Sequence, residues 1–255
     1  MHPAPRSSDD SSVVTLSVVI PAFNEVDRIG ATVTRVLAFL DSRPYTSELI
    51  VVLDGGHAGA SEAIARACGG RADVRVIDNG QNRGKGYSVR QGILASRGHY
   101  ALFADADLSL PIEDGERFLA ALRDGADVAI GSRALLDSTE SGDQQPIRHL
   151  LSRGFNWIVQ RVALPGLRDT QCGFKAFDGR CARALFAVQR INGFGFDVEV
   201  LRIAQRWRCR IVEVPVRCEY HASSSVRKVR DGASMIIDIA RTRWLDARGA
   251  YRDVR

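Results

Sequence analysis

Short apolar runs alternate with amphipathic stretches along the first half of the chain. The apolar runs are rich in β-branched residues, which predicts buried β-strands. These predicted strands lie within residues 16–25, 48–56, 74–79, 100–107 and 127–133. The intervening stretches predict helices, most clearly where apolar residues recur at helical spacing. The expected helices lie within residues 29–40, 61–68 and 86–95.

Strands that alternate with helices predict a single α/β domain with a mostly parallel, Rossmann-like sheet and helices on both faces. In such sheets, ligands bind beyond the carboxyl ends of the strands. Asp54, Asp105 and Asp107 are placed at such ends. Because side chains alternate along a strand, Asp105 and Asp107 are expected to point to the same side of the backbone.

The pattern becomes less regular after Arg133. Residues 136–146 are polar and rich in turn formers, which predicts a loop. Residues 147–163 predict an amphipathic helix that either docks on the sheet or lies on a membrane surface. The expected organisation is a disordered tail over residues 1–14, a folded α/β domain over 15–230 and a basic helical extension over 231–255.

Charge is concentrated at the C-terminal end. The whole chain carries a net charge of +5, and the segment from Arg202 to Arg255 contains thirteen Lys and Arg against six Asp and Glu. Such a segment favours anionic partners, namely phosphates, nucleic acid or an acidic membrane surface. Nucleic acid is disfavoured because no recognition motif accompanies the arginines.

Other features of the sequence point to a cytosolic protein. No run of 18 apolar residues is present, and the first residues lack the apolar region of a secretory signal. The five cysteines are scattered and form no CxxC pair, which favours reduced thiols over a zinc site or disulfides.

Two motifs carry candidate chemistry. Asp105 and Asp107 form an acidic pair in "FADADLSLP", and hard cations such as Mg²⁺ and Mn²⁺ take carboxylates together with substrate phosphates. In "QNRGKGYSVRQG", glycines let the backbone approach a ligand, while Arg83, Lys85 and Arg90 supply positive charge for phosphate oxygens. A glycine-rich turn that simply enters a helix is the structural alternative for the second motif.

The ordered motifs resemble those of family 2 glycosyltransferases with a GT-A fold. Within that family the sequence is similar to the dolichyl-phosphate glucosyltransferase and polyprenyl-phosphate mannosyltransferase group. The resemblance covers residues 17–230 and rests on "SVVIPAFNE", "NRGKG", "FADADLSLP", "IGSR", "DTQCGFKAF", "FGFDVEVL", "EVPV" and "SSSVR". "NRGKG" with "VRQG" and "DTQCGFK" favours the glucosyl branch.

The resemblance implies a role for each matching residue. Asp105 and Asp107 would bind Mg²⁺ or Mn²⁺ against the sugar-nucleotide diphosphate, Arg133 would lie near the acceptor phosphate, and Asp197 and Glu199 would face the donor sugar. Gln171 and Cys172 would line the sugar pocket. The nucleotide and its diphosphate would be bordered by Pro21, Ala22, Asn24, Glu25, Asp54, Arg83, Lys85, Ser225 and Arg227. The implied reaction is inverting transfer of a hexose, with glucose favoured, from a UDP-sugar to a polyprenyl or dolichyl phosphate.

One segment departs from the family pattern. The usual "DDGS" is here "LDGG", which keeps Asp54 but has Leu53 in place of the first carboxylate. That change leaves UDP favoured and GDP open. A lipid acceptor implies peripheral contact with an anionic membrane at its cytoplasmic face, for which residues 147–163 and 227–248 are the candidates.

Three alternatives stay open. One is a GT-A transferase with a soluble acceptor, and another is a sugar-nucleotide- or membrane-binding protein without turnover. A sugar-1-phosphate nucleotidyltransferase is more distant, because "PAFNEVDRIG" is not the glycine-rich, basic loop that such enzymes place after the first strand.

Overall fold

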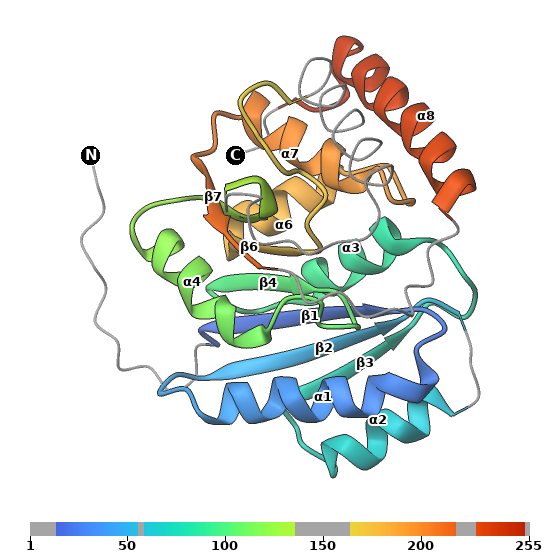
Figure 1. Ribbon diagram of the computed structural model, residues 1–255, viewed down its shortest axis with the longest axis vertical. Helices are drawn as coiled ribbons and strands as arrows, with labels where there is room; N and C mark the ends of the chain where they lie inside the picture. The colour runs from blue at the N-terminus through green and yellow to red at the C-terminus, as the bar shows by residue number, and fades with distance from the viewer. Residues whose placement is uncertain (1–13, 56–58, 136–163, 218–227, 253–255) are drawn as a thin grey trace.

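A seven-stranded sheet forms the centre of the molecule (Figure 1). The computed structural model describes residues 14–55, 59–135, 164–217 and 228–252. The strand order is β3-β2-β1-β4-β6-β5-β7, and every neighbouring pair is parallel except the two made by β6. The strands are β1 (Leu16–Ala22), β2 (Ser47–Leu53), β3 (Val74–Asp78), β4 (Tyr100–Ala104), β5 (Val128–Ser132), β6 (Phe174–Asp178) and β7 (Ile211–Pro215). The expected mostly parallel α/β sheet is confirmed.

Helices cover both faces of the sheet and build two cores. One core lies between the sheet and α1 (Val26–Asp41), α2 (Ala60–Cys68) and α4 (Gly115–Arg123). The other lies beneath α3 (Lys85–Ala95), α6 (Gly179–Val188) and α7 (Phe196–Arg206), with α8 (Lys228–Ala247) packed outside α7. Short 3₁₀ turns occur at Ile112–Asp114 and Arg133–Leu135. Because the central strands are buried on both faces, they are continuous apolar runs rather than alternating ones.

The second half of the domain was not resolved by the hydrophobic pattern. β6, α6, α7 and β7 were not predicted, and neither was α4 in the first half. β6 is only five residues long and includes a buried lysine, Lys175, so it is not a continuous apolar run. The predicted helix at 147–163 and the predicted loop at 136–146 lie outside the described residues, as does all but Val14 of the predicted tail. None of the described helices has the length and hydropathy required to cross a membrane.

Arg90 serves the fold in the described structure. Its guanidinium donates to the backbone carbonyls of Phe186 and Ala187, at 2.9 and 3.4 Å. These bonds tie α3 to the end of α6. The phosphate role predicted for Arg90 therefore competes with a structural one.

Two helical glycines give a matched test of this packing. A methyl group at Gly92 of α3 would overlap Val19 Cγ1 of β1, whereas one at Gly30 of α1 would lie 3.5 Å or more from its neighbours. Gly92→Ala should therefore destabilise the protein by about 1–3 kcal/mol. Gly30→Ala should be neutral or stabilising by up to about 1 kcal/mol. Urea unfolding measures both, and equal effects would show that α3 does not pack closely on the sheet.

Candidate active site

The two carboxylates of the acidic pair lie in a turn at the carboxyl end of β4. β4 ends at Ala104, so Asp105 follows the strand and Asp107 lies in the turn itself. The expectation that strand alternation aligns the pair is therefore wrong. The Ser109 amide donates to Asp107 Oδ1 at 3.0 Å, as in an Asx turn.

Neighbouring segments hold this turn in place. Thr32 of α1 donates its hydroxyl to the Ala106 carbonyl at 2.6 Å, and the Asp105 amide donates to the Gly173 carbonyl at 3.1 Å. Leu108, with a φ of 44°, adopts a left-handed conformation that is uncommon for a bulky residue. The turn is thus bound on two sides and carries backbone strain, which proteins often concentrate at functional sites.

Gly173 gives the Asp105 carboxylate its space. A Cβ at this position would overlap both the Oδ2 atom and the Cγ atom of Asp105. The side chain of Asp105 is 37% exposed, so its carboxylate remains open to a ligand. Glycine in "DTQCGFK" is therefore a steric requirement of the acidic pair.

Lys85 forms an ion pair with this carboxylate. Its Nζ lies 2.6 Å from Asp105 Oδ1. Burial alone would lower the pKa of Lys85, but the charges of Asp105, Asp197 and Asp107 outweigh burial and hold that pKa above its ordinary value. The lysine is consequently an ammonium ion near three carboxylates, so a phosphate ligand would have to bring a cation with it.

A second ion pair lies deeper. Lys175 of β6 donates from Nζ to Asp197 Oδ1 at 2.5 Å and to the Cys172 carbonyl at 2.7 Å. Both side chains are almost completely buried. Burial raises the pKa of Asp197, and the charges of Lys175 and Lys85 oppose that rise. Asp197 therefore lies near the charge of Lys85, and its predicted role toward the donor sugar stays a prediction. Its described partner is Lys175, which belongs to no motif singled out in the sequence.

Asp54 organises the glycine-rich loop. One carboxylate oxygen accepts from the Asn79 side chain at 2.9 Å and from the Arg83 amide at 2.8 Å, and the other accepts from the Gly84 amide at 2.8 Å. Gly84, with a φ of 101°, lies against the Asn192 carbonyl, where a side chain would overlap. Asp54 thus sets the position from which Lys85 reaches Asp105. Its predicted contact with uridine stays a prediction.

The hydrogen bonds of Glu199 join it to segments other than the acidic pair. Its fully buried carboxylate accepts from the amides of Arg190 and Ile191, at 3.0 and 2.7 Å, and from the Tyr251 hydroxyl at 2.6 Å. Burial raises its pKa, although these hydrogen bonds oppose the rise. Glu199 therefore holds the segment before α7 against the C-terminal end of the described chain, and its role toward the sugar stays a prediction.

Arg133 is held by a buried carboxylate. Its Nε and Nη2 atoms donate to the two oxygens of Asp169 at 2.6 and 3.0 Å, and its amide donates to the same carboxylate at 3.1 Å. Burial would raise the pKa of Asp169, but the hydrogen bonds and charge of Arg133 hold it below its ordinary value. This fork fixes a guanidinium that is 38% exposed.

Buried polar atoms surround this fork. Ser132 Oγ, Thr170 Oγ1 and Gln171 Nε2 have no hydrogen-bond partner among the described residues. Gly131 lies against Cys172 Sγ, so the segment ending in Arg133 runs beside the one from Asp169 to Cys172. Unpaired buried donors are costly unless a ligand or water satisfies them. Ser132 and Thr170 were missed by sequence reasoning, because an isolated hydroxyl carries no motif.

The loop after β1 lies at the same edge of the sheet as the acidic pair, because β1 and β4 are parallel neighbours. Pro21 and Ala22 end the strand, and Asn24 has a left-handed φ of 57°. Glu25 Oε2 forms an ion pair with Arg28 Nε at 2.7 Å. In the glycine-rich loop, the Arg83 guanidinium lies over the Tyr87 ring, 5.1 Å from its centroid. Ser225 and Arg227 lie outside the described residues.

The acidic pair fits a cation that is shared with a ligand. Among the described residues, no three His, Cys, Asp or Glu side chains are grouped to hold a metal ion by themselves. Mg²⁺ and Mn²⁺ commonly use one or two carboxylates and complete their shell with phosphates and water. The open carboxylate of Asp105, in the space that Gly173 leaves, suits this mode of binding.

Comparison with known proteins identifies a family. The model of "Glycosyl transferase family 2" matches residues 17–186. A dolichyl-phosphate beta-glucosyltransferase of Drosophila melanogaster is 38% identical over 225 residues, covering 83% of this chain and 69% of that protein. The enzyme of the same name from Saccharomyces cerevisiae is 35% identical over 263 residues, covering 96% and 78%.

Solved structures share the fold at low sequence identity. Mannosyl-3-phosphoglycerate synthase from Rubrobacter xylanophilus aligns with a TM-score of 0.66 at 16% identity, covering 95% of this chain and 77% of that one. Glucosyl-3-phosphoglycerate synthase from Mycobacterium tuberculosis, solved with Mn²⁺, UDP-glucose and phosphoglyceric acid, aligns with a TM-score of 0.64 at 17% identity, covering 94% and 85%. These matches confirm the expected GT-A fold.

The buried pair gives a double-mutant test. Lys175→Met should cost about 3–5 kcal/mol of unfolding free energy, because it leaves the Asp197 carboxylate buried without its partner. Lys175→Met combined with Asp197→Leu should recover most of that loss, since neither charge of the pair then remains buried without its partner. Urea unfolding of the wild type, both single variants and the double variant measures the coupling. Additive losses would contradict a direct buried pair.

Proposed function

The chain belongs to glycosyl transferase family 2, and we propose that this glycosyltransferase moves glucose from UDP-glucose to a polyprenyl phosphate to give a β-linked lipid phosphate sugar. The observation that carries the proposal is the acidic pair beside Lys85, at the strand edge where this fold binds ligands. The similarity to dolichyl-phosphate beta-glucosyltransferases over more than four-fifths of the chain supports glucose as the transferred sugar and a lipid phosphate as the acceptor.

The leaving diphosphate would lie beside Lys85 and the acidic pair. Asp105 and Asp107 would hold a Mg²⁺ or Mn²⁺ ion, which when bound supplies neutralising charge for the diphosphate. Lys85 would contribute a further positive charge from its place against Asp105. Because Asp54 and the Asn192 backbone fix the loop that carries Lys85, this charge is positioned before the reaction begins.

The acceptor phosphate would bind beside Arg133. An oxygen of the acceptor phosphate attacks the anomeric carbon of the sugar. The bond from that carbon to the β-phosphate oxygen of UDP breaks, and UDP leaves with the electron pair. The attack inverts the configuration at that carbon. A phosphate is already ionised at neutral pH, so no strong general base is required, and positioning becomes the main demand. The fork with Asp169 gives Arg133 that fixed position.

Ser132, Thr170 and Gln171 would supply hydrogen bonds to the transferred sugar or the acceptor phosphate. These three polar atoms, which have no partner within the described part of the chain, lie next to Arg133 in the sequence or in the segment that holds it. A hydroxyl-rich ligand would give them hydrogen bonds that the described residues do not supply. Contact with an anionic membrane surface at its cytoplasmic face is part of the proposal, because a polyprenyl acceptor resides in a bilayer.

A donor and acceptor screen tests the proposal. UDP-glucose, UDP-galactose, UDP-N-acetylglucosamine and GDP-mannose are each supplied with Mn²⁺ and a short-chain polyprenyl phosphate, and lipid-linked sugar is measured. We expect transfer from UDP-glucose that EDTA abolishes.

A parallel reaction offers 3-phosphoglycerate as a soluble acceptor, because solved structures with this fold include phosphoglycerate-dependent synthases. Transfer to phosphoglycerate alone would replace the lipid acceptor with a soluble one. Binding of a nucleotide sugar without transfer or hydrolysis would leave a binding protein without turnover, and neither binding nor hydrolysis with all four donors would indicate a degenerate site.

A further inference from the structure

The last described helix presents apolar side chains outward. Ile236, Ile237 and Trp244 of α8 are 56%, 67% and 52% exposed. Helical spacing places them on one side of the helix together with Ala240 and Ala247, which are also exposed. We call these five residues the α8 outer stripe. Large apolar side chains gathered on one exposed face commonly mark an interaction surface.

This stripe is not the packing face of α8. The opposite side buries Ile239 and Leu245 against the second core. Asp246 on that side accepts from Arg202 Nε and Arg206 Nη1 of α7, at 2.8 and 2.9 Å. α8 is thus already docked on α7 at the outside of the molecule (Figure 1), and among the described residues the stripe forms a second, exposed apolar face of the helix.

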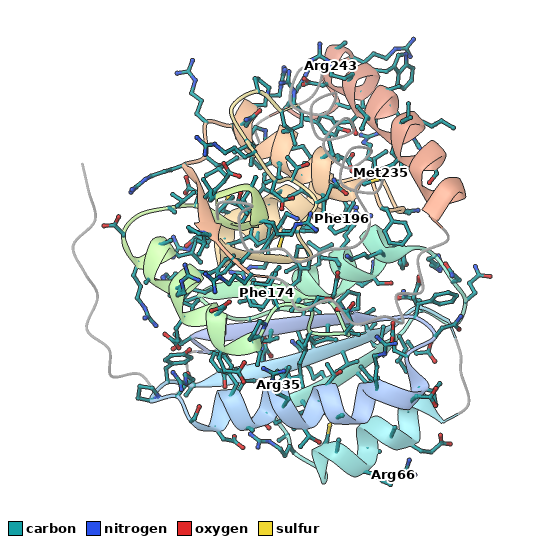
Figure 2. All side chains as sticks on the ribbon, in the orientation of Figure 1. Arg35, Arg66, Phe174, Phe196, Met235 and Arg243 are labelled. Atoms are coloured by element: carbon teal, nitrogen blue, oxygen red, sulfur yellow. The ribbon has the colours of Figure 1, made fainter. Side chains whose placement is uncertain are left out.

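Arginines border the stripe on both sides. Arg243 flanks it near Ile236, and Arg241 and Arg248 flank it on the other edge, by the same helical spacing. All three arginines are exposed, and the Arg248 guanidinium lies 4.1 Å from the centroid of the Trp244 ring. Figure 2 shows Arg243 on the outer end of the helix, away from the sheet.

We propose that the α8 outer stripe is the surface by which the protein docks on an anionic lipid bilayer. Apolar side chains with a tryptophan and flanking arginines are the pattern of a helix that lies in a membrane interface. The arginines would contact lipid phosphates while Ile236, Ile237 and Trp244 enter the acyl boundary. This docking surface rests on the proposed lipid-phosphate reaction, because it identifies the residues that would attach the enzyme to the bilayer holding the acceptor.

The same helix reaches the loops of the candidate active site. Asp238 Oδ2 accepts from the amide of Gly195 at 3.3 Å, and Gly195 has no space for a side chain against Asp238. The segment from Ile191 to Gly195 lies in turn against Gly84 and Gly86 of the "NRGKG" loop. Docking through α8 would therefore hold the "NRGKG" loop in a fixed orientation to the bilayer.

Vesicle binding tests the docking surface without any sugar donor or polyprenyl acceptor. The full chain is sedimented with phosphatidylcholine vesicles that contain or lack phosphatidylglycerol. We expect Ile236→Ser combined with Ile237→Ser to weaken binding at least about tenfold, because two apolar side chains no longer enter the bilayer. Val76→Ser, at another exposed apolar residue on the edge strand β3, is the matched control and should bind as the wild type does.

Two further readouts separate charge from insertion. Arg243→Gln should weaken binding about fivefold on anionic vesicles only, and the weakening should vanish at high salt. The emission of Trp244 should shift to shorter wavelength on binding and be quenched by brominated lipid, with Trp244→Phe identifying its contribution. Salt should reduce binding without abolishing it, since apolar contacts are not screened.

Several outcomes would overturn the docking surface. The proposal fails if the wild-type protein binds vesicles neither with nor without phosphatidylglycerol. It also fails if the double isoleucine variant binds as the wild type does. A wild-type dimer in solution that this variant converts to a monomer would assign the stripe to a second copy of the chain. Transfer to a water-soluble polyprenyl phosphate analogue, measured on the same variants, reports on the proposed reaction separately. Loss of vesicle binding with retained transfer in the double variant supports the docking surface, and vesicle binding by the wild type without transfer overturns only the reaction.

Discussion

The ion pair between Lys85 and Asp105 is the contact on which the candidate site depends. It places an ammonium group against the first carboxylate of the acidic pair, at 2.6 Å. Like charges at the end of one strand repel one another, so the carboxylates need positive partners. Lys85 meets this need for Asp105 and Lys175 meets it for Asp197. A site organised in this way is prepared for a ligand that brings both negative phosphates and a cation.

Carboxylates also position the loops that carry this chemistry. Asp54, Asp169, Glu199 and Asp238 each accept at least one backbone amide, and each fixes a segment next to the site. Hydrogen bonds from backbone amides to a carboxylate are strong, and a buried carboxylate requires several of them. The acidic residues of the motifs therefore divide into those that remain open to ligand, such as Asp105, and those that hold the backbone, such as Asp54 and Glu199. That division explains why aspartates and glutamates occur in motifs far apart in the sequence.

The first half of the fold could be predicted from the sequence because its signals are local. Buried parallel strands are continuous apolar runs, and α1 has a clear helical period, so five strands and three helices were located. β6 runs antiparallel between β4 and β5 and contains Lys175, which interrupts its apolar run. The acidic pair and the basic, glycine-rich loop selected Asp105 and Lys85, and the resemblance to a family selected Arg133. It could not show that Lys175 pairs with Asp197 or that Asp169 holds Arg133, because these contacts join segments 22 and 36 residues apart.

In the proposed site, the acidic pair binds a diphosphate together with a divalent cation. Calorimetric titration of UDP tests it most directly, with Mn²⁺ and with EDTA, on the wild type, Asp105→Asn and the exposed control Asp124→Asn. We predict that UDP binds only with Mn²⁺ to the wild type and the control, and at least about tenfold more weakly to Asp105→Asn. Equal UDP affinity in EDTA, or unchanged affinity in Asp105→Asn, would contradict the account.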